Sequence, residues 1–204
     1  MSIAGSKGTS SVLWYGREGG YDIIVLEYLG NSLGDLIDEQ KFDSRKAFEP
    51  DNFMVKADSV TPTVFLIDFD LARQFRDPAT HLHIPYTTKH SIVGTLLFTS
   101  INGQQGYAQS RRDDLESLVY TIIYLARGDL LHEAVLQEKM SLTAEELCEG
   151  LPAPFREFIV HVRSLGFNKK PDYEHLHSIL SQCSDTEIDQ PDKALPFSAP
   201  PLSV

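Results

Sequence analysis

Residues 109–118 read Gln-Ser-Arg-Arg-Asp-Asp-Leu-Glu-Ser-Leu, and they open the clearest helix in the chain. From Asp114 to Ala126, apolar side chains recur every three or four residues, which is the pattern of a helix with one buried face. One interpretation of the acidic residues at its start is that they complement the helix dipole. The other reading makes Asp114 a buried carboxylate that accepts backbone hydrogen bonds.

Strand patterns precede this helix and helical patterns follow it. Stretches rich in β-formers predict one antiparallel hairpin over residues 12–28 and a second over residues 52–68. Apolar spacing predicts three helices, over 114–126, 155–165 and 173–183, and a capping-box pattern at Thr143 starts another. The predicted fold class is therefore α+β, mostly helical in the second half of the chain.

Composition narrows the function classes. The chain has 204 residues and a formal net charge of −11, which argues against nonspecific binding to nucleic acid or to anionic membranes. Its two cysteines, Cys148 and Cys183, show no disulfide framework, and this favours a reducing compartment. Neither a signal-peptide core nor an apolar run long enough for a bilayer is evident, so we expect an intracellular protein.

The composition also changes along the chain. Residues 1–11 are rich in Gly, Ser and Thr and are predicted to be flexible, whereas residues 12–183 carry the periodic patterns of one folded domain. Residues 184–204 contain four prolines and are predicted to be disordered.

Two polar residues at the ends of the second predicted hairpin suggest a metal site. Asp68 follows an apolar strand, and Asn52, within Pro50-Asp-Asn, lies just before the preceding strand. Together they could hold one divalent ion against phosphates, although Asp68 alone more often starts a turn. A zinc site at His81 and His83 is disfavoured, because no further ligand has suitable spacing.

Several stretches together resemble the casein kinase 1 family of serine/threonine protein kinases. The most specific are residues 75–86, Ser100-Ile-Asn-Gly and residues 109–118. The Ser-Ile-Asn run stands where most other kinases have Ala-Pro-Glu. The resemblance covers residues 12–183 and implies a protein-kinase-like fold, mainly the helical C-terminal lobe with a remnant hairpin of the N-terminal lobe.

The resemblance also implies functions for particular residues. ATP and magnesium are the family's cofactors. Backbone groups of Glu27 and Leu29, in Leu26-Glu-Tyr-Leu-Gly, would hydrogen-bond adenine at the hinge. Asn52 and Asp68 would be magnesium ligands, and Asp114 would anchor the catalytic loop from below.

Departures from the family pattern are as informative. The sequence before Val12 leaves no room for a Gly-rich loop, for the lysine that holds the phosphates, or for the helix that pairs with it. Between Lys46 and Pro50 the family has a core helix, a strand and His-Arg-Asp, so the catalytic base is missing, and Asp51 does not replace it. Asp70 stands in place of a glycine, and Leu97 in place of an arginine that favours acidic or phosphorylated substrates.

These departures predict an incomplete, degenerate kinase domain without catalysis, in which ATP and magnesium bind weakly or not at all. Without the core helix, the apolar face over residues 115–126 would be partly uncovered and open to protein partners, so the domain would be at most an interaction module. An alternative is an active serine/threonine kinase whose missing segments reflect a splice or gene-model boundary. A third reading is a structural or binding protein unrelated to kinases.

Overall fold

The computed structural model describes residues 7–34, 50–56, 63–127 and 136–183. The described residues fall into two compact units. The first comprises residues up to Asp68 and the second begins at Phe69. The predicted tail, residues 184–204, and residues 1–6 of the predicted flexible N-terminus lie outside the described ranges.

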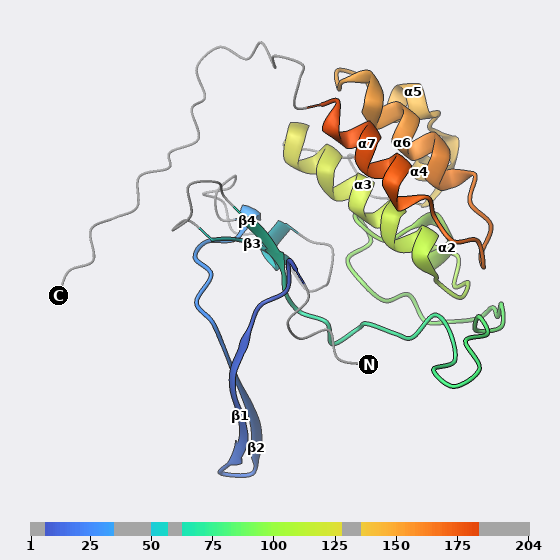
Figure 1. Ribbon diagram of the computed structural model, residues 1–204. Helices are drawn as coiled ribbons and strands as arrows, with labels where there is room; N and C mark the ends of the chain where they lie inside the picture. Colours follow the sequence, from blue (N-terminus) through green and yellow to red (C-terminus); the bar gives the residue numbers. More distant parts are fainter. Residues whose placement is uncertain (1–6, 35–49, 57–62, 128–135, 184–204) are drawn as a thin grey trace, which may run out of the picture. The chain divides into compact units, whose positions relative to one another are not determined.

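The first unit begins with a long twisted β-ribbon (Figure 1). Strands β1 (Val12–Glu18) and β2 (Tyr21–Leu26) pair antiparallel, with Glu18 opposite Tyr21. The two-residue turn at Gly19 and Gly20 has φ values of +58° and +87°, which glycine adopts without strain. The hairpin predicted over residues 12–28 is thus confirmed.

A second, shorter hairpin completes this unit. A turn of 3₁₀ helix, η1 (Pro50–Asn52), leads into β3 (Phe53–Lys56), which pairs antiparallel with β4 (Thr63–Leu66) and confirms the hairpin predicted over residues 52–68. The described part of the N-terminus is attached to β4, since the Gly8 carbonyl accepts from the Leu66 amide at 2.9 Å. The flexibility predicted for residues 1–11 stays a prediction.

The second unit is helical. Its helices are α2 (Ile101–Gln104), α3 (Arg111–Arg127), α4 (Leu136–Ser141), α5 (Ala144–Leu147), α6 (Ala153–Arg163) and α7 (Tyr173–Ser181). Three of them, α3, α6 and α7, were predicted from apolar spacing, with ends shifted by at most three residues. The Thr143 capping box at the start of α5 is present in full.

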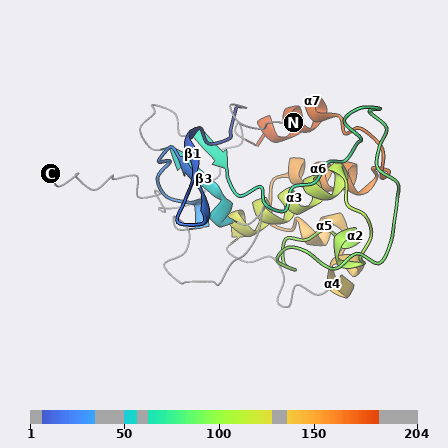
Figure 2. The same cartoon turned by 90° about the horizontal axis from the view of Figure 1, so that it is seen from below.

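Helices α3, α6 and α7 pack together around the core of this unit (Figure 2). Ile123, Ile159 and Ile179, one from each helix, are fully buried there. The face of α3 expected to be partly uncovered has Leu118 and Ile122 half-buried. Within the described ranges, no helix combines the length and the hydropathy needed to cross a membrane.

Candidate functional site

The two candidate magnesium ligands lie at the same end of the β3–β4 hairpin. Phe53 pairs with Leu66, and the next residues outward are joined because the Ile67 amide donates to the Asn52 carbonyl at 2.9 Å. Asp68 directly follows Ile67. The structure therefore brings together two residues that are 16 positions apart in the sequence.

The local geometry of both residues fits a metal site. Asn52 is buried, and its Nδ2 has no hydrogen-bond partner among the described residues. Asp68 is exposed and has a φ of +60°, a conformation that costs a non-glycine residue about 1–3 kcal/mol and often marks functional sites. An amide oxygen and a carboxylate are ligands that magnesium accepts, with water or phosphate oxygens completing the shell. The residue types therefore suit the ion, and the magnesium site stays a prediction.

Asp70, which replaces a glycine of the family, carries no such strain. Unlike Asp68, Asp70 does not have a positive φ. The substitution therefore removes a freedom that this backbone does not use.

Glu27, a predicted hinge residue, ties three segments together. Its amide donates to the Ser11 carbonyl at 3.0 Å, and its Oε1 accepts from the Ser11 amide at 2.8 Å. Its Oε2 lies 3.2 Å from Nζ of Lys56 on β3. The hydrogen bonds from Ser11, followed by that from Lys56, lower the pKa of the Glu27 carboxyl below its ordinary value.

The rest of the hinge is fixed against β3. Leu29 is buried, and the Val55 amide donates to the Asn31 carbonyl at 2.9 Å. Gly30 has a φ of +108°, and a Cβ there would lie 2.7 Å from the Val55 carbonyl oxygen, so only glycine fits. Within the described residues, the Glu27 carbonyl and the Leu29 amide have no backbone partner, and adenine binding there stays a prediction.

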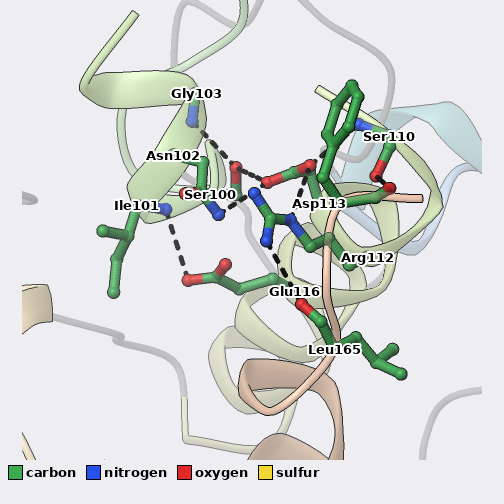
Figure 3. Close-up of polar contacts among 10 residues, drawn as sticks. Ser100, Ile101, Asn102, Gly103, Ser110, Arg112, Asp113, Glu116 and Leu165 are labelled. Atoms are coloured by element: carbon green, nitrogen blue, oxygen red, sulfur yellow. Dashed lines mark hydrogen bonds and ion pairs between the residues drawn. The ribbon is translucent and has the colours of Figure 1, made fainter. Parts of the chain in front are cut away.

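In the second unit, a buried carboxylate organises the Ser-Ile-Asn motif (Figure 3). Asp113 is fully buried and accepts from Ser100 Oγ at 3.0 Å, Asn102 Nδ2 at 3.0 Å and the Ser110 amide at 2.8 Å. One turn later, Oε1 of Glu116 accepts from the Ile101 amide at 3.2 Å. The motif therefore joins α2 to the first turns of α3.

Asp113, not the neighbouring Asp114, therefore holds the Ser-Ile-Asn motif, and the function predicted for Asp114, anchoring the catalytic loop, stays a prediction. The Asp114 residue is exposed, with solvent on one side and protein on the other. Desolvation on the protein side, together with the charge of Asp113, raises the pKa of Asp114 to about 7. A signal for Asp113 was present in the sequence, since Ser110 three residues earlier completes the spacing of a helix cap.

Lys139 on α4 is a second buried charged group that sequence reasoning missed. Its Nζ donates to the Leu96 carbonyl at 2.8 Å and to the Thr99 carbonyl at 2.7 Å, and it lies 4.2 Å from the centre of the Tyr120 ring. Burial lowers the pKa of Lys139 to about 7. Leu97, in the segment that Lys139 holds, packs against the helical core.

Comparison with known proteins agrees with this arrangement. A family model described as fungal protein kinase matches residues 50–126. Casein kinase I homolog 3 of Schizosaccharomyces pombe is 34% identical over 218 residues, a match that takes in 87% of this chain and 49% of the relative. The chain thus spans about half the length of this curated relative. With the Ser-Ile-Asn network and the β3–β4 end in place, the chain belongs to the casein kinase 1-like family of protein kinases.

Proposed function

We propose that this casein kinase 1-like domain is catalytically inactive and serves as an interaction module. The observation that carries the proposal lies inside the chain, where Lys46 is followed after three residues by Pro50-Asp-Asn. The match to the S. pombe relative runs over 218 residues, whereas 87% of this 204-residue chain is about 177 residues. About 40 residues of the relative within the match therefore have no counterpart in this chain. A gap of that size accommodates the core helix, the strand and His-Arg-Asp.

Without His-Arg-Asp, no residue accepts the proton of a substrate hydroxyl. Asp51 is the carboxylate of Pro50-Asp-Asn, but its Oδ1 lies directly against Gly34, in the space that a Cβ there would fill. That placement supports a structural function for Asp51 at the segment after the hinge. Because phosphoryl transfer depends on positioning and electrostatics, losing the base removes much of the rate.

A residual cofactor site remains part of the proposal. Glu27 and Leu29 would offer backbone groups to adenine, and Asn52 and Asp68 would hold magnesium with few other contacts to the nucleotide. Leu97 supplies an apolar side chain where the family pattern has an arginine, so an acidic substrate would lose one cationic contact. The two free cysteines, Cys148 and Cys183, support an intracellular location.

A phosphotransfer assay tests the proposal. The full chain, with magnesium and ATP, should phosphorylate neither casein nor itself above the level of Asp68→Ala. Asp70→Ala is the matched control, because it removes an exposed carboxylate two residues away that is not a candidate ligand. A signal that survives in Asp70→Ala but disappears in Asp68→Ala and Asn52→Ala would show that the site is catalytic.

The juxtaposition of Asn52 and Asp68 favours one second candidate, an active serine/threonine kinase whose missing segments occur in another form of the gene product. Sequencing the transcript across Lys46–Pro50 distinguishes the two. In-frame coding for a helix, a strand and His-Arg-Asp would support the active kinase, and a continuous junction would support the inactive domain.

A further inference from the structure

The β1–β2 hairpin exposes large apolar side chains on both of its faces. Tyr15 and Ile24 are paired on one face and are 65% and 60% exposed. Trp14, Tyr21 and Val25 are exposed on the other face. At about 200 Å² for a fully exposed large side chain, the apolar residues of the hairpin leave roughly 900 Å² open. This area is divided between two faces, so each face is comparable with the largest apolar patch of a typical monomer.

The two edges of this hairpin differ. Among the described residues, β1 and β2 have no strand partner except each other, so both outer edges are open. The β1 edge is irregular, since it has a register shift between Val12 and Trp14 and a glycine at Gly16. Such irregularities, with the charges of Arg17 and Glu18, protect an edge against further pairing.

The β2 edge lacks these protections. Its six residues, Tyr-Asp-Ile-Ile-Val-Leu, contain no bulge, proline or glycine. The single charge, Asp22, lies 3.8 Å from Arg17 on β1. A regular, apolar, nearly uncharged strand with an open edge readily accepts another strand.

We propose that two copies of the chain associate by antiparallel pairing of their β2 edges, centred on Ile24. The two-residue turn closes the pair Glu18–Tyr21, so Asp22, Ile24 and Leu26 direct their backbone groups away from β1. A two-fold axis at Ile24 sets Asp22 of each copy opposite Leu26 of the other. No two carboxylates then face each other, and the same patch is used by both copies.

The area and the charge set the expected strength. Pairing that covers about half of the exposed apolar area of each hairpin removes roughly 900 Å² over both copies, which is in the range of weak, transient interfaces. The net charge of −11 opposes association of two copies. The dimer is therefore weak and strengthens as salt screens this repulsion, whereas an interface based on ion pairs would weaken.

Sedimentation of the full chain from about 1 to 100 µM tests the proposal. The wild type should move from one copy to two with concentration, and more readily at high salt. Ile24→Lys should stay monomeric, because it places charges at the two-fold axis. Leu13→Lys, at an equally exposed position on β1, is the control and should still dimerise.

Ile24→Pro adds a test of the backbone pairing. If the Ile24 amide faces outward, proline there leaves the hairpin intact but removes a donor from the new interface. Trp14 fluorescence and circular dichroism show whether each variant is folded. If the proline variant does not fold, the dimerisation of Ile24→Lys alone tests the proposed interface. A wild type that stays monomeric at the highest concentration overturns the proposal, as does equal dissociation by Leu13→Lys and Ile24→Lys, or growth beyond two copies.

Discussion

Replacing Asp113 by alanine should destabilise the helical unit strongly, whereas the same change at Asp114 should not. Asp113 is fully buried, and its carboxylate is the acceptor for Ser100 Oγ, Asn102 Nδ2 and the Ser110 amide. Alanine leaves these three donors without an acceptor, and two of them, from Ser100 and Ser110, are buried. Each buried donor left unsatisfied costs about 1–3 kcal/mol, and partial relaxation brings the expected total to about 3–5 kcal/mol.

Asp114→Ala is the matched control, because it removes an adjacent carboxylate that is exposed. Because desolvation raises the pKa of Asp114, its charged form does not stabilise the folded chain, and Asp114→Ala should leave the unfolding midpoint unchanged or raise it. Asp113→Asn, which keeps one oxygen acceptor, should fall between the two alanine variants.

Urea unfolding followed by circular dichroism at the helix band measures the effect, since the helices are in the second unit. With a domain stability of about 5–15 kcal/mol, Asp113→Ala should lose roughly a fifth of it or more. The reasoning is refuted if Asp114→Ala lowers the unfolding midpoint as much as Asp113→Ala does.

Three further outcomes follow from the same contacts. The dissociation constant for ATP should exceed about 1 mM, which corresponds to a binding free energy of less than about 4 kcal/mol. Millimolar Mg-ATP should therefore not raise the melting temperature. A rise of several degrees that Asp68→Ala abolishes would contradict this. Burial lowers the pKa of Lys139 from 10.5 to about 7. Between pH 7 and 10.5, the unfolded chain therefore binds more protons than the folded chain, and the free energy of unfolding rises with pH. Lys139→Met should remove that rise, by up to about 1 kcal/mol per pH unit in urea titrations, and identical pH profiles would exclude it. Gly30→Ala should cost about 1–3 kcal/mol in unfolding followed by Trp14 fluorescence, because its Cβ meets the Val55 carbonyl; an unchanged midpoint contradicts the close approach.

The elements that the sequence predicted are those determined by local pattern. The β1–β2 hairpin has β-formers on both sides of Gly19-Gly20, and α3 has an apolar repeat over several turns. Helices α2 and α4 are too short for such a repeat. A helix of so few residues is stable only through tertiary contacts, here those of Ser100 with Asp113 and of Lys139 with the Thr99 carbonyl.

The candidate site was predictable to a similar extent. Asn52 and Asp68 could be placed together because the hairpin between them has a sequence signal, and the structure joins its ends. The choice between Asp113 and Asp114 was not predictable from apolar spacing alone. Consecutive residues on a helix point about 100° apart, so the phase set by the start of α3 at Arg111 decides which carboxylate faces inward.

The contrast between these two carboxylates supports the reading of a domain that has lost catalysis but kept its fold. The resemblance gives Asp114 the function of holding the catalytic loop, and the His-Arg-Asp of that loop does not occur in this sequence. Desolvation, with the charge of Asp113, raises the pKa of Asp114, whereas hydrogen bonds from Thr80 lower the pKa of Asp77. Asp113 finds its donors within the helical unit. Among the described residues, Asp114 has no such set of donors, which is what the proposed loss of the catalytic loop would leave.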